Sequence, residues 1–156
     1  MNYKKIFAQK VECNQNAKIL SRFLPEDTAA VYLYENDQGL RFCVLAYDVY
    51  KSESNVYALN YYRQKQLMDA VEWVGQKKLP AKIAKYPNLY VLTSAKEEKM
   101  SVLLINHFMD EIYTPVIELD KMYSEIRFVN CSGELVGDKV YLTDISPYSI
   151  AVFEVS

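Results

Sequence analysis

Few side chains in this sequence are of the types that carry out catalysis, and they are widely spaced. His107 is the only histidine in the 156 residues, so a Ser/His/Asp or Cys/His site would need it as the base. It follows the apolar run 103–105, at the expected end of a strand, and no GxSxG motif supplies a nucleophile. We expect a structural role for His107, with a small independent enzyme that uses it as base as an alternative.

Carboxylates are a second possible basis for catalysis, because glycoside hydrolysis requires two of them facing one cleft. The acidic residues to consider are Glu35, Asp37, Asp48, Glu118 and Asp120. The first three lie in a turn or at a strand end. The last two occupy alternate positions of one expected strand, where both would face solvent. We therefore predict that the chain contains no catalytic residue.

The sequence does not indicate a metal site or a cofactor site. The cysteines, Cys13, Cys43 and Cys131, are far apart and form no CxxC pair, which argues against a zinc site. Cys43 lies in an apolar run, so we expect a buried free thiol there. No glycine-rich phosphate-binding loop occurs. We therefore predict neither a metal nor a cofactor.

Tyrosine is unusually frequent, with 14 copies. Exposed aromatic rings can cover the apolar face of a sugar, whereas buried rings fill protein cores. Most of the tyrosines lie in the expected helix or strands, where packing explains them. Three lie near expected loops and are the candidate carbohydrate-binding residues: Tyr57, Tyr86 and Tyr113.

Charge and composition argue against several classes of function. The net charge of −2 and the pI of about 5.5 do not provide the basic face that nucleic-acid binding needs. No apolar stretch approaches the roughly 20 residues of a membrane helix. The segment 1–10 lacks the apolar core of a signal peptide. We expect a soluble, cytoplasmic protein that binds neither nucleic acid nor membrane.

The first half of the chain is expected to form a hairpin followed by a helix, in a unit of residues 1–80. Two apolar runs, 29–34 and 40–47, flank a turn rich in Asn, Asp and Gly, a pattern typical of a β-hairpin. The segments 6–11 and 17–24 are weaker strand candidates. We expect this N-terminal stretch to pair with the hairpin, because a hairpin alone leaves two bare sheet edges.

A helix is expected over 56–74, because apolar residues recur there at steps of three and four positions. Gly75 follows as the expected left-handed C-terminal cap. Trp73 lies at the edge of the apolar stripe, and we expect the junction between the two units to cover it. The stripe itself consists of Leu59, Tyr62, Leu67, Ala70, Val71 and Val74.

The second half, residues 88–156, alternates apolar and polar residues in short runs separated by turn residues. Short strands at this spacing predict a small antiparallel β-sandwich. The predicted fold class is α+β and mostly antiparallel β, with the hairpin-plus-helix unit before the sandwich. The expected strands span 89–93, 100–106, 114–119, 126–129, 139–142 and 149–155.

Four motifs in this order carry a family resemblance. The hairpin ends in Ala-Tyr-Asp at 46–48, the helix contains Arg-Gln-Lys-Gln-Leu at 63–67 and Trp-Val at 73–74, and the last strand begins Pro-Tyr-Ser-Ile-Ala-Val at 147–152. Together they resemble the non-catalytic C-terminal region of β-galactosidase-like glycoside hydrolases, which ends in a small β-sandwich. The resemblance covers roughly residues 17–156.

The resemblance implies a non-catalytic accessory module, because in that family the acid and the nucleophile belong to a separate catalytic barrel. The chain alone is then not expected to be an enzyme. Its implied partner is the catalytic domain of a glycosidase, or a second copy of the chain, bound through an apolar patch that we expect in residues 1–23. Two alternatives remain open: a carbohydrate-binding module that uses the loop tyrosines, and a stand-alone protein with another role.

Overall fold

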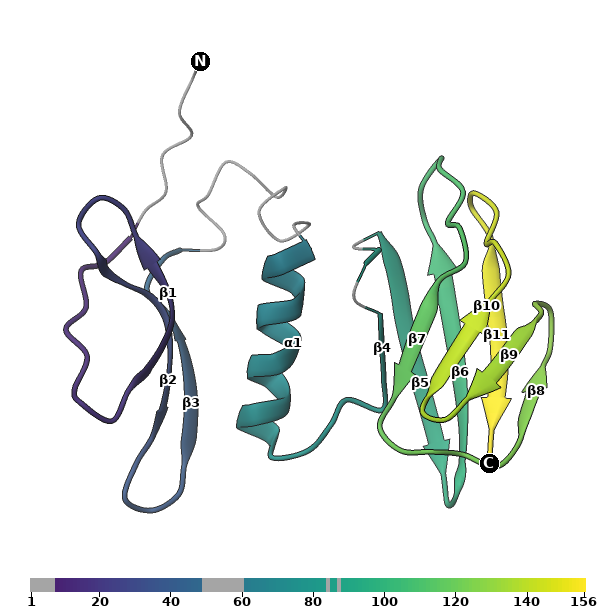
Figure 1. Ribbon diagram of the computed structural model, residues 1–156, viewed down its shortest axis with the longest axis horizontal. Helices are drawn as coiled ribbons and strands as arrows, with labels where there is room; N and C mark the ends of the chain where they lie inside the picture. Colours follow the sequence, from purple (N-terminus) through teal and green to yellow (C-terminus); the bar gives the residue numbers. More distant parts are fainter. Residues whose placement is uncertain (1–7, 49–60, 84, 87) are drawn as a thin grey trace. The chain divides into compact units, whose positions relative to one another are not determined.

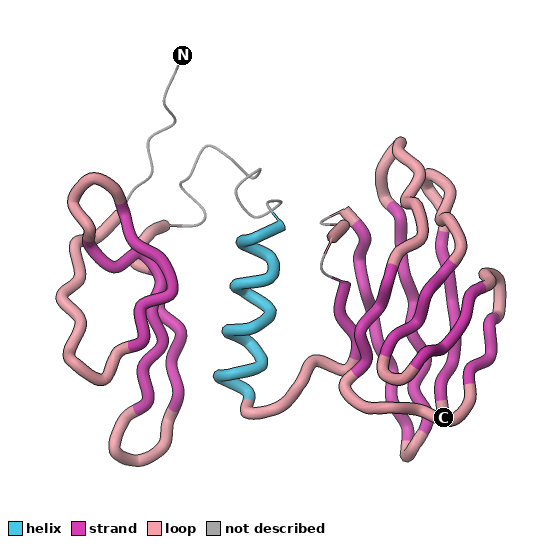
Figure 2. The backbone as a smooth tube through the Cα atoms, in the orientation of Figure 1, coloured by secondary structure: helices cyan, strands magenta, loops and turns pink. Residues whose placement is uncertain are grey.

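The computed structural model describes residues 8–48, 61–83, 85–86 and 88–156. The chain divides into two compact units, Met1–Lys77 and Lys78–Ser156, which we call unit 1 and unit 2. Antiparallel strands dominate both units, and the one helix of the described residues belongs to unit 1 (Figure 2). The predicted α+β, mostly antiparallel fold is confirmed.

Unit 1 combines a three-stranded antiparallel sheet with a helix (Figure 1). The sheet has the order β1-β2-β3, so the hairpin supplies its centre and one edge. Pairing of the first strand with the hairpin confirms the prediction for the segment 17–24. The predicted strand 6–11 is not present in the described part of that segment, where Ala8 forms only an isolated bridge with Tyr47. The elements are β1 (Lys18–Phe23), β2 (Thr28–Glu35), β3 (Arg41–Leu45) and α1 (Tyr61–Gly75).

The turn between β2 and β3 is built around one asparagine. The side-chain oxygen of Asn36 accepts hydrogen bonds from the amides of Gln38 and Leu40, at 3.0 and 2.9 Å. Gly39 has a φ of 77°, a conformation that costs glycine little. The turn chemistry read from the sequence therefore explains this hairpin.

Helix α1 buries little of the apolar stripe expected from the sequence. Of the expected stripe within the described residues, only Ala70 is buried, while Tyr62 and Val71 are exposed. The contacts to the sheet come instead from long polar and aromatic side chains. Arg63 donates to the hydroxyl of Ser21 at 3.2 Å. Little of the apolar stripe is therefore buried, because the apolar stems of polar residues can cover a sheet as well.

Trp73 lies on this sheet-facing side of α1. The guanidinium carbon of Arg41, on β3, is 5.0 Å from the centre of its ring, a cation–π geometry. The same arginine donates to the Trp73 carbonyl at 3.2 Å. The left-handed position after the helix belongs to Gln76, with a φ of 54°, rather than to Gly75.

Unit 2 is a sandwich of two four-stranded antiparallel sheets (Figure 1). One sheet has the order β4-β7-β10-β9 and the other the order β5-β6-β11-β8. Its strands are β4 (Ala81–Ile83), β5 (Leu89–Lys96), β6 (Lys99–Asn106), β7 (Val116–Leu119), β8 (Ile126–Phe128), β9 (Gly133–Val136), β10 (Lys139–Leu142) and β11 (Ile150–Val155).

Two of these strands were not expected from the sequence. β4 lies in the segment predicted to link the two halves, and it pairs with β7 through Ala81 and Leu119. β9 begins at Gly133, which the sequence suggested as a turn residue. A Cβ atom at this glycine would meet the carbonyl oxygen of Tyr141 on β10. Glycine is therefore needed here for the close approach of two strands rather than for a turn.

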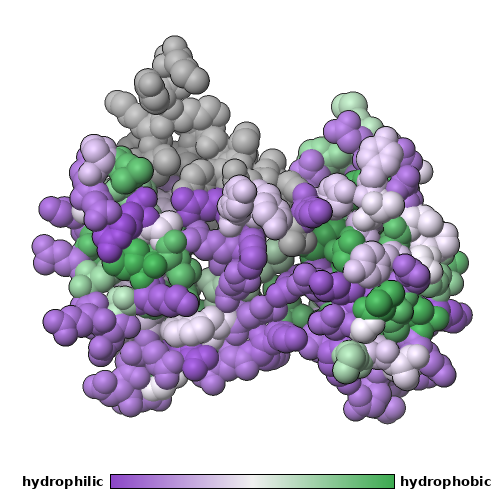
Figure 3. Space-filling view, viewed as in Figure 1, coloured by the Kyte–Doolittle hydropathy of each residue, from purple (hydrophilic) through white to green (hydrophobic). Residues whose placement is uncertain are grey.

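The core of unit 2 lies between its two sheets. Phe153, Val102, Ile117 and Val140 are fully buried, and they come from both layers, as a sandwich requires. Figure 3 shows that the outer surface is largely hydrophilic, with smaller hydrophobic areas over both units. Within the described ranges, no helix has the length and apolar character needed to cross a bilayer.

Candidate functional site

Two loops of unit 2, residues 107–115 and 143–149, come together at one end of the sandwich (Figure 1). Ile112 and Ile145 form an isolated antiparallel bridge, in which each amide donates to the other carbonyl, at 3.0 and 2.9 Å. The amide of Tyr148 donates to the carbonyl of a residue in the other loop at 3.3 Å. We call this region the loop end.

Asn106, the last residue of β6, holds both loops from inside the sandwich. It is only 1% exposed, and its side-chain nitrogen donates to the carbonyls of Asp110, Ile145 and Ser146 at 2.8, 3.3 and 3.0 Å. Its side-chain oxygen accepts from the amide of Phe108 at 3.2 Å. One buried amide therefore satisfies backbone groups of both loops, which fixes their conformation.

Two of the three predicted carbohydrate-binding tyrosines meet at the loop end. The hydroxyl of Tyr86 donates to the carbonyl oxygen of Tyr113 at 2.6 Å. Tyr86 is half-buried and ties the segment before β5 to the 107–115 loop. Tyr113 is 60% exposed, so its ring remains available to a ligand. Tyr57 lies outside the described residues.

The charged groups in the two loops are acidic. Asp110, Glu111 and Asp144 lie there, and neither loop contains lysine or arginine. The pKa of the Tyr113 phenol is raised, first by the negative charge of Glu111 and its hydrogen bond, then by desolvation and by the other two carboxylates. The amide of Thr114 donates to Oδ1 of Asp144 at 2.8 Å, which fixes this carboxylate between the loops.

A groove of about 490 Å³ opens beside Asp144, between the 143–149 loop and the segment 130–132. Its volume falls within the range of roughly 300–1,000 Å³ found for small-molecule sites. Most of the polar part of its wall consists of side chains with a hydroxyl or an amide group, which can both donate and accept hydrogen bonds. The residues that carry these groups are Asn130, Ser132, Thr143, Ser146 and Ser149.

The solvent side of the sheet β5-β6-β11-β8 carries a second candidate surface. Successive residues of a strand face opposite sides of the sheet, so the neighbours of core residues point outward here. Three of the outward residues are exposed and three are half-buried, and all six are apolar or aromatic. They form two rows across paired strands, which we call the apolar rows: Tyr90–Ile105–Ile150 and Leu92–Leu103–Val152.

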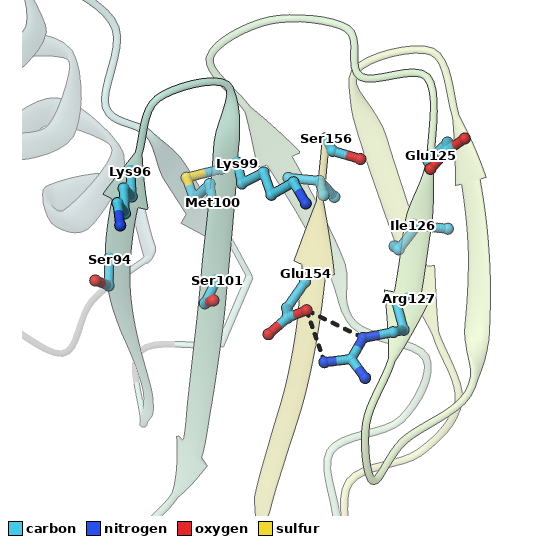
Figure 4. A pocket seen from close by; sticks show the side chains of 11 residues that line it. Ser94, Lys96, Lys99, Met100, Ser101, Glu125, Ile126, Arg127, Glu154 and Ser156 are labelled. Atoms are coloured by element: carbon cyan, nitrogen blue, oxygen red, sulfur yellow. Dashed lines mark hydrogen bonds and ion pairs between the residues drawn. The ribbon is translucent and has the colours of Figure 1, made fainter.

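The next row on the same face is polar. Ser94, Ser101, Glu154 and Arg127 are paired in this order across all four strands of the sheet. They line a pocket of about 340 Å³ (Figure 4). Nε and Nη2 of Arg127 both donate to Oε2 of Glu154, at 3.0 and 2.8 Å. The face therefore changes from apolar to charged along its strands.

No protein family matches the sequence, and no curated protein matches it. Similar solved structures include a β-galactosidase from Bacillus circulans sp. alkalophilus, with 10% identity, a TM-score of 0.45, and coverage of 90% of this chain and 18% of the enzyme. They also include Gan42B, a GH42 β-galactosidase, with 14% identity, a TM-score of 0.45, and coverage of 89% and 18%. The chain spans less than a fifth of either enzyme.

The candidate catalytic carboxylates are distributed over both units. Glu35 accepts from Nε of Arg41 at 2.7 Å. In unit 2, Glu118 lies 4.0 Å from Nζ of Lys82, and Asp120 accepts from a tyrosine hydroxyl at 3.1 Å. Glu118 faces solvent as expected, with 43% of its side chain exposed, whereas Asp120 is half-buried and follows β7 instead of belonging to it.

His107 lies at the loop end next to aromatic rings. Its ring is 6.3 Å from that of Tyr90 and 6.0 Å from that of Phe108, both edge-on. It is exposed. It follows directly after the end of β6.

The cysteines are free thiols. Cys43 is half-buried rather than fully buried, and burial raises the pKa of its thiol. Burial also raises the pKa of the Cys131 thiol, whose sulfur donates to a β11 carbonyl at 3.3 Å. Across the ranges that the structure describes, no three His, Cys, Asp or Glu side chains are grouped to hold a metal ion.

The apolar rows were not predicted, although the sequence contains a sign of them. The run Val102–Ile105 has four consecutive apolar residues, whereas a strand with one solvated face should alternate. This run therefore indicates a strand with apolar side chains on both faces. We expected an apolar patch in residues 1–23, and β1 of that stretch pairs with the hairpin as predicted.

Proposed function

We propose that the chain is a non-catalytic accessory module that packs against the catalytic domain of a glycoside hydrolase through the apolar rows of unit 2. The observation that carries this proposal is the position of these rows on the solvent side of a complete sandwich. Monomeric proteins rarely leave contiguous apolar patches larger than roughly a few hundred Å² exposed. A partner that covers the rows would remove this surface from water.

The strand pattern supports a covered sheet. Antiparallel sheets with one solvated face place polar residues there. In β6, Val102 and Leu104 point into the core and are fully buried, while Leu103 and Ile105 between and after them are also apolar. A strand of this kind is stabilised when both faces of its sheet are packed.

The border of the apolar rows supports a protein partner. Stable interfaces commonly have an apolar centre and a polar rim. The pair Arg127–Glu154, with Lys96 and Lys99 nearby, forms such a rim at one end of the face (Figure 4). The choice of a glycosidase catalytic domain as the partner rests on the motif resemblance in 17–156.

Site-specific photo-crosslinking would test the proposal. A benzophenone amino acid in place of Leu103, at the centre of the apolar rows, is expected to crosslink the chain to a glycoside hydrolase catalytic domain in extracts of the organism that makes it. The same amino acid in place of Tyr141, an exposed residue on the opposite sheet, serves as the matched control. Mass spectrometry of the crosslinked peptides identifies the partner.

The substitution Leu103→Asp should abolish the crosslinked complex when it is combined with a probe in place of Leu92. A crosslink from Leu103 to unit 1 of the same chain would show that the chain covers its own apolar rows, and the proposal would then be wrong. Crosslinks only to a second copy of the chain would point to self-association instead and would also contradict it.

We predict that the isolated chain hydrolyses no aryl glycoside. Retaining and inverting glycosidases need two carboxyl groups about 5–9.5 Å apart around one bond, and within unit 2 the candidates Glu118 and Asp120 are engaged by Lys82 and by the hydroxyl of Tyr123. The measurement is release of nitrophenol from nitrophenyl β-galactoside and related substrates. Turnover that is lost in Glu118→Gln or Asp120→Asn would contradict the prediction, whereas turnover unchanged by both would indicate a contaminating enzyme.

A further inference from the structure

We propose that the loop end of unit 2 binds a neutral carbohydrate, with Tyr113 and Tyr148 as ring platforms and the groove beside Asp144 as the polar subsite. This site is separate from the apolar rows. The proposal does not depend on the docking role, and either can fail without the other.

The aromatic part of the site rests on two exposed tyrosines in loops that are bonded to each other. Tyr113 is 60% exposed and Tyr148 is 66% exposed. The first follows directly after Ile112 of the bridge to Ile145, and the amide of the second bonds the opposite loop at 3.3 Å. Exposed tyrosine rings suit the apolar C–H face of a pyranose, because the hydroxyl can stay hydrated while the ring is covered.

Tyr148 also has an uncommon backbone conformation. Its φ is 50°, in the left-handed region that bulky residues seldom adopt. A residue held there requires support from its surroundings, and the bonds from Asn106 to Ile145 and Ser146 supply that support just before it. The loop thus keeps an exposed ring in a defined place at some cost in backbone energy.

The polar part of the site matches the chemistry of sugar hydroxyls. A hydroxyl group both donates and accepts, so it binds well to a wall of serine, threonine and asparagine side chains together with a carboxylate. The groove supplies hydroxyls from Thr143 and Ser146 next to Asp144. One oxygen of Asp144 is fixed by the amide of Thr114 at 2.8 Å, which orients the carboxylate.

The charge of the loop end selects among ligands. The carboxylates of Asp110, Glu111 and Asp144, in loops without lysine or arginine, would repel uronic acids and sulfated sugars. A small organic cation could use carboxylates and a ring face. The hydroxyl-rich groove favours a sugar over a cation, because a cation cannot accept hydrogen bonds from the hydroxyl and amide donors in that wall.

The site is preorganised for binding. The buried amide of Asn106, the bridge between Ile112 and Ile145 and the bond from Tyr86 to Tyr113 hold the loops in place. A ligand then orders few additional groups when it binds, which preserves affinity. This matters for single sugars, which offer little apolar area.

An NMR titration of the full chain tests the proposal. The probes are lactose, cellobiose and maltose as neutral sugars, heparin as an anionic polysaccharide and choline as a small cation. We expect at least one neutral disaccharide to shift the amide signals of 107–115 and 143–149, and heparin to leave them unchanged. Tyr113→Ala and Tyr148→Ala should each weaken binding about tenfold, which corresponds to about 1.4 kcal/mol.

Tyr141→Ala is the matched control, because Tyr141 is an exposed tyrosine on β10 that belongs to neither loop. Its binding curve should equal that of the unchanged chain. The amide spectrum of each variant shows whether it is folded. Absence of shifts with all three neutral sugars would overturn the proposal, and so would shifts with choline alone or equal weakening by Tyr141→Ala.

Discussion

Replacing Asn106 with leucine is expected to lower the free energy of unfolding of unit 2 by about 3 kcal/mol or more, because a buried polar group left without a partner costs about 1–3 kcal/mol. The leucine would leave the amide of Phe108 and the carbonyls of Asp110 and Ser146 without their bonds to Asn106. The Asn106 side chain is buried and these three bonds are partly buried, so water replaces them poorly. Urea denaturation followed by circular dichroism measures the change.

Asn130 provides the control for this substitution. Its side chain also bonds to backbone, donating to the carbonyl of Ile150 at 3.1 Å and accepting from the amide of Val152 at 2.7 Å, but it is exposed. Water can replace these bonds, so Asn130→Leu should cost about 1 kcal/mol or less. Equal costs for the two variants would show that Asn106 does not hold the loop end in the way we describe.

The second large effect is expected for Phe153→Ala, which should destabilise unit 2 by about 3–5 kcal/mol. Phe153 is fully buried at the centre of the sandwich, with its ring 6.3 Å from that of Phe128. Truncation removes apolar contact area and leaves a cavity that the rigid sheets can only partly close. The midpoint of denaturation should fall accordingly.

Ile150→Ala, on the same strand, is the matched control. Its side chain is exposed, so little burial is lost and the change should stay near 0.5 kcal/mol. Because Trp73 is the only tryptophan and lies in unit 1, its fluorescence reports the unfolding of unit 1 separately from that of unit 2. A Phe153→Ala chain as stable as Ile150→Ala would contradict the described core.

The alternation of apolar and polar residues was sufficient to predict most strands of unit 2. β10 and the core positions of β11 match the expected pattern within about one residue. β4 was missed because three residues after Pro80 are too few to show a period. β9 was missed because Gly133 was interpreted as a turn residue, although it allows a close strand contact.

The helix shows where a periodic pattern misleads. The apolar stripe expected from the sequence includes Tyr62 and Val71, but both are exposed. The face toward the sheet includes Arg63, whose partner Ser21 lies 42 positions earlier in the chain. Hydropathy alone gives an arginine no weight as a packing residue, although its methylene groups and planar head can cover a sheet.

The candidate site could be predicted only in part, for a topological reason. Tyr86 and Tyr113 were singled out for their loop positions, and the structure joins them across 27 residues. Tyr148 was assigned to packing, because it appeared to begin the last strand. The meeting of its loop with the 107–115 loop depends on the bridge between Ile112 and Ile145, which no local pattern in either loop indicates.

The place of β11 in its sheet has a consequence for synthesis of the protein on the ribosome. β11 lies between β6 and β8, so β8 has no hydrogen-bonded neighbour in the sheet until residues 150–155 have been made. Because chains emerge from the N-terminal end, unit 1 can fold during translation, whereas the sandwich closes only after its last strand arrives. Until then Val102 and Phe128 remain open to water, and a ribosome that pauses before Ile150 would expose an aggregation-prone half-sandwich.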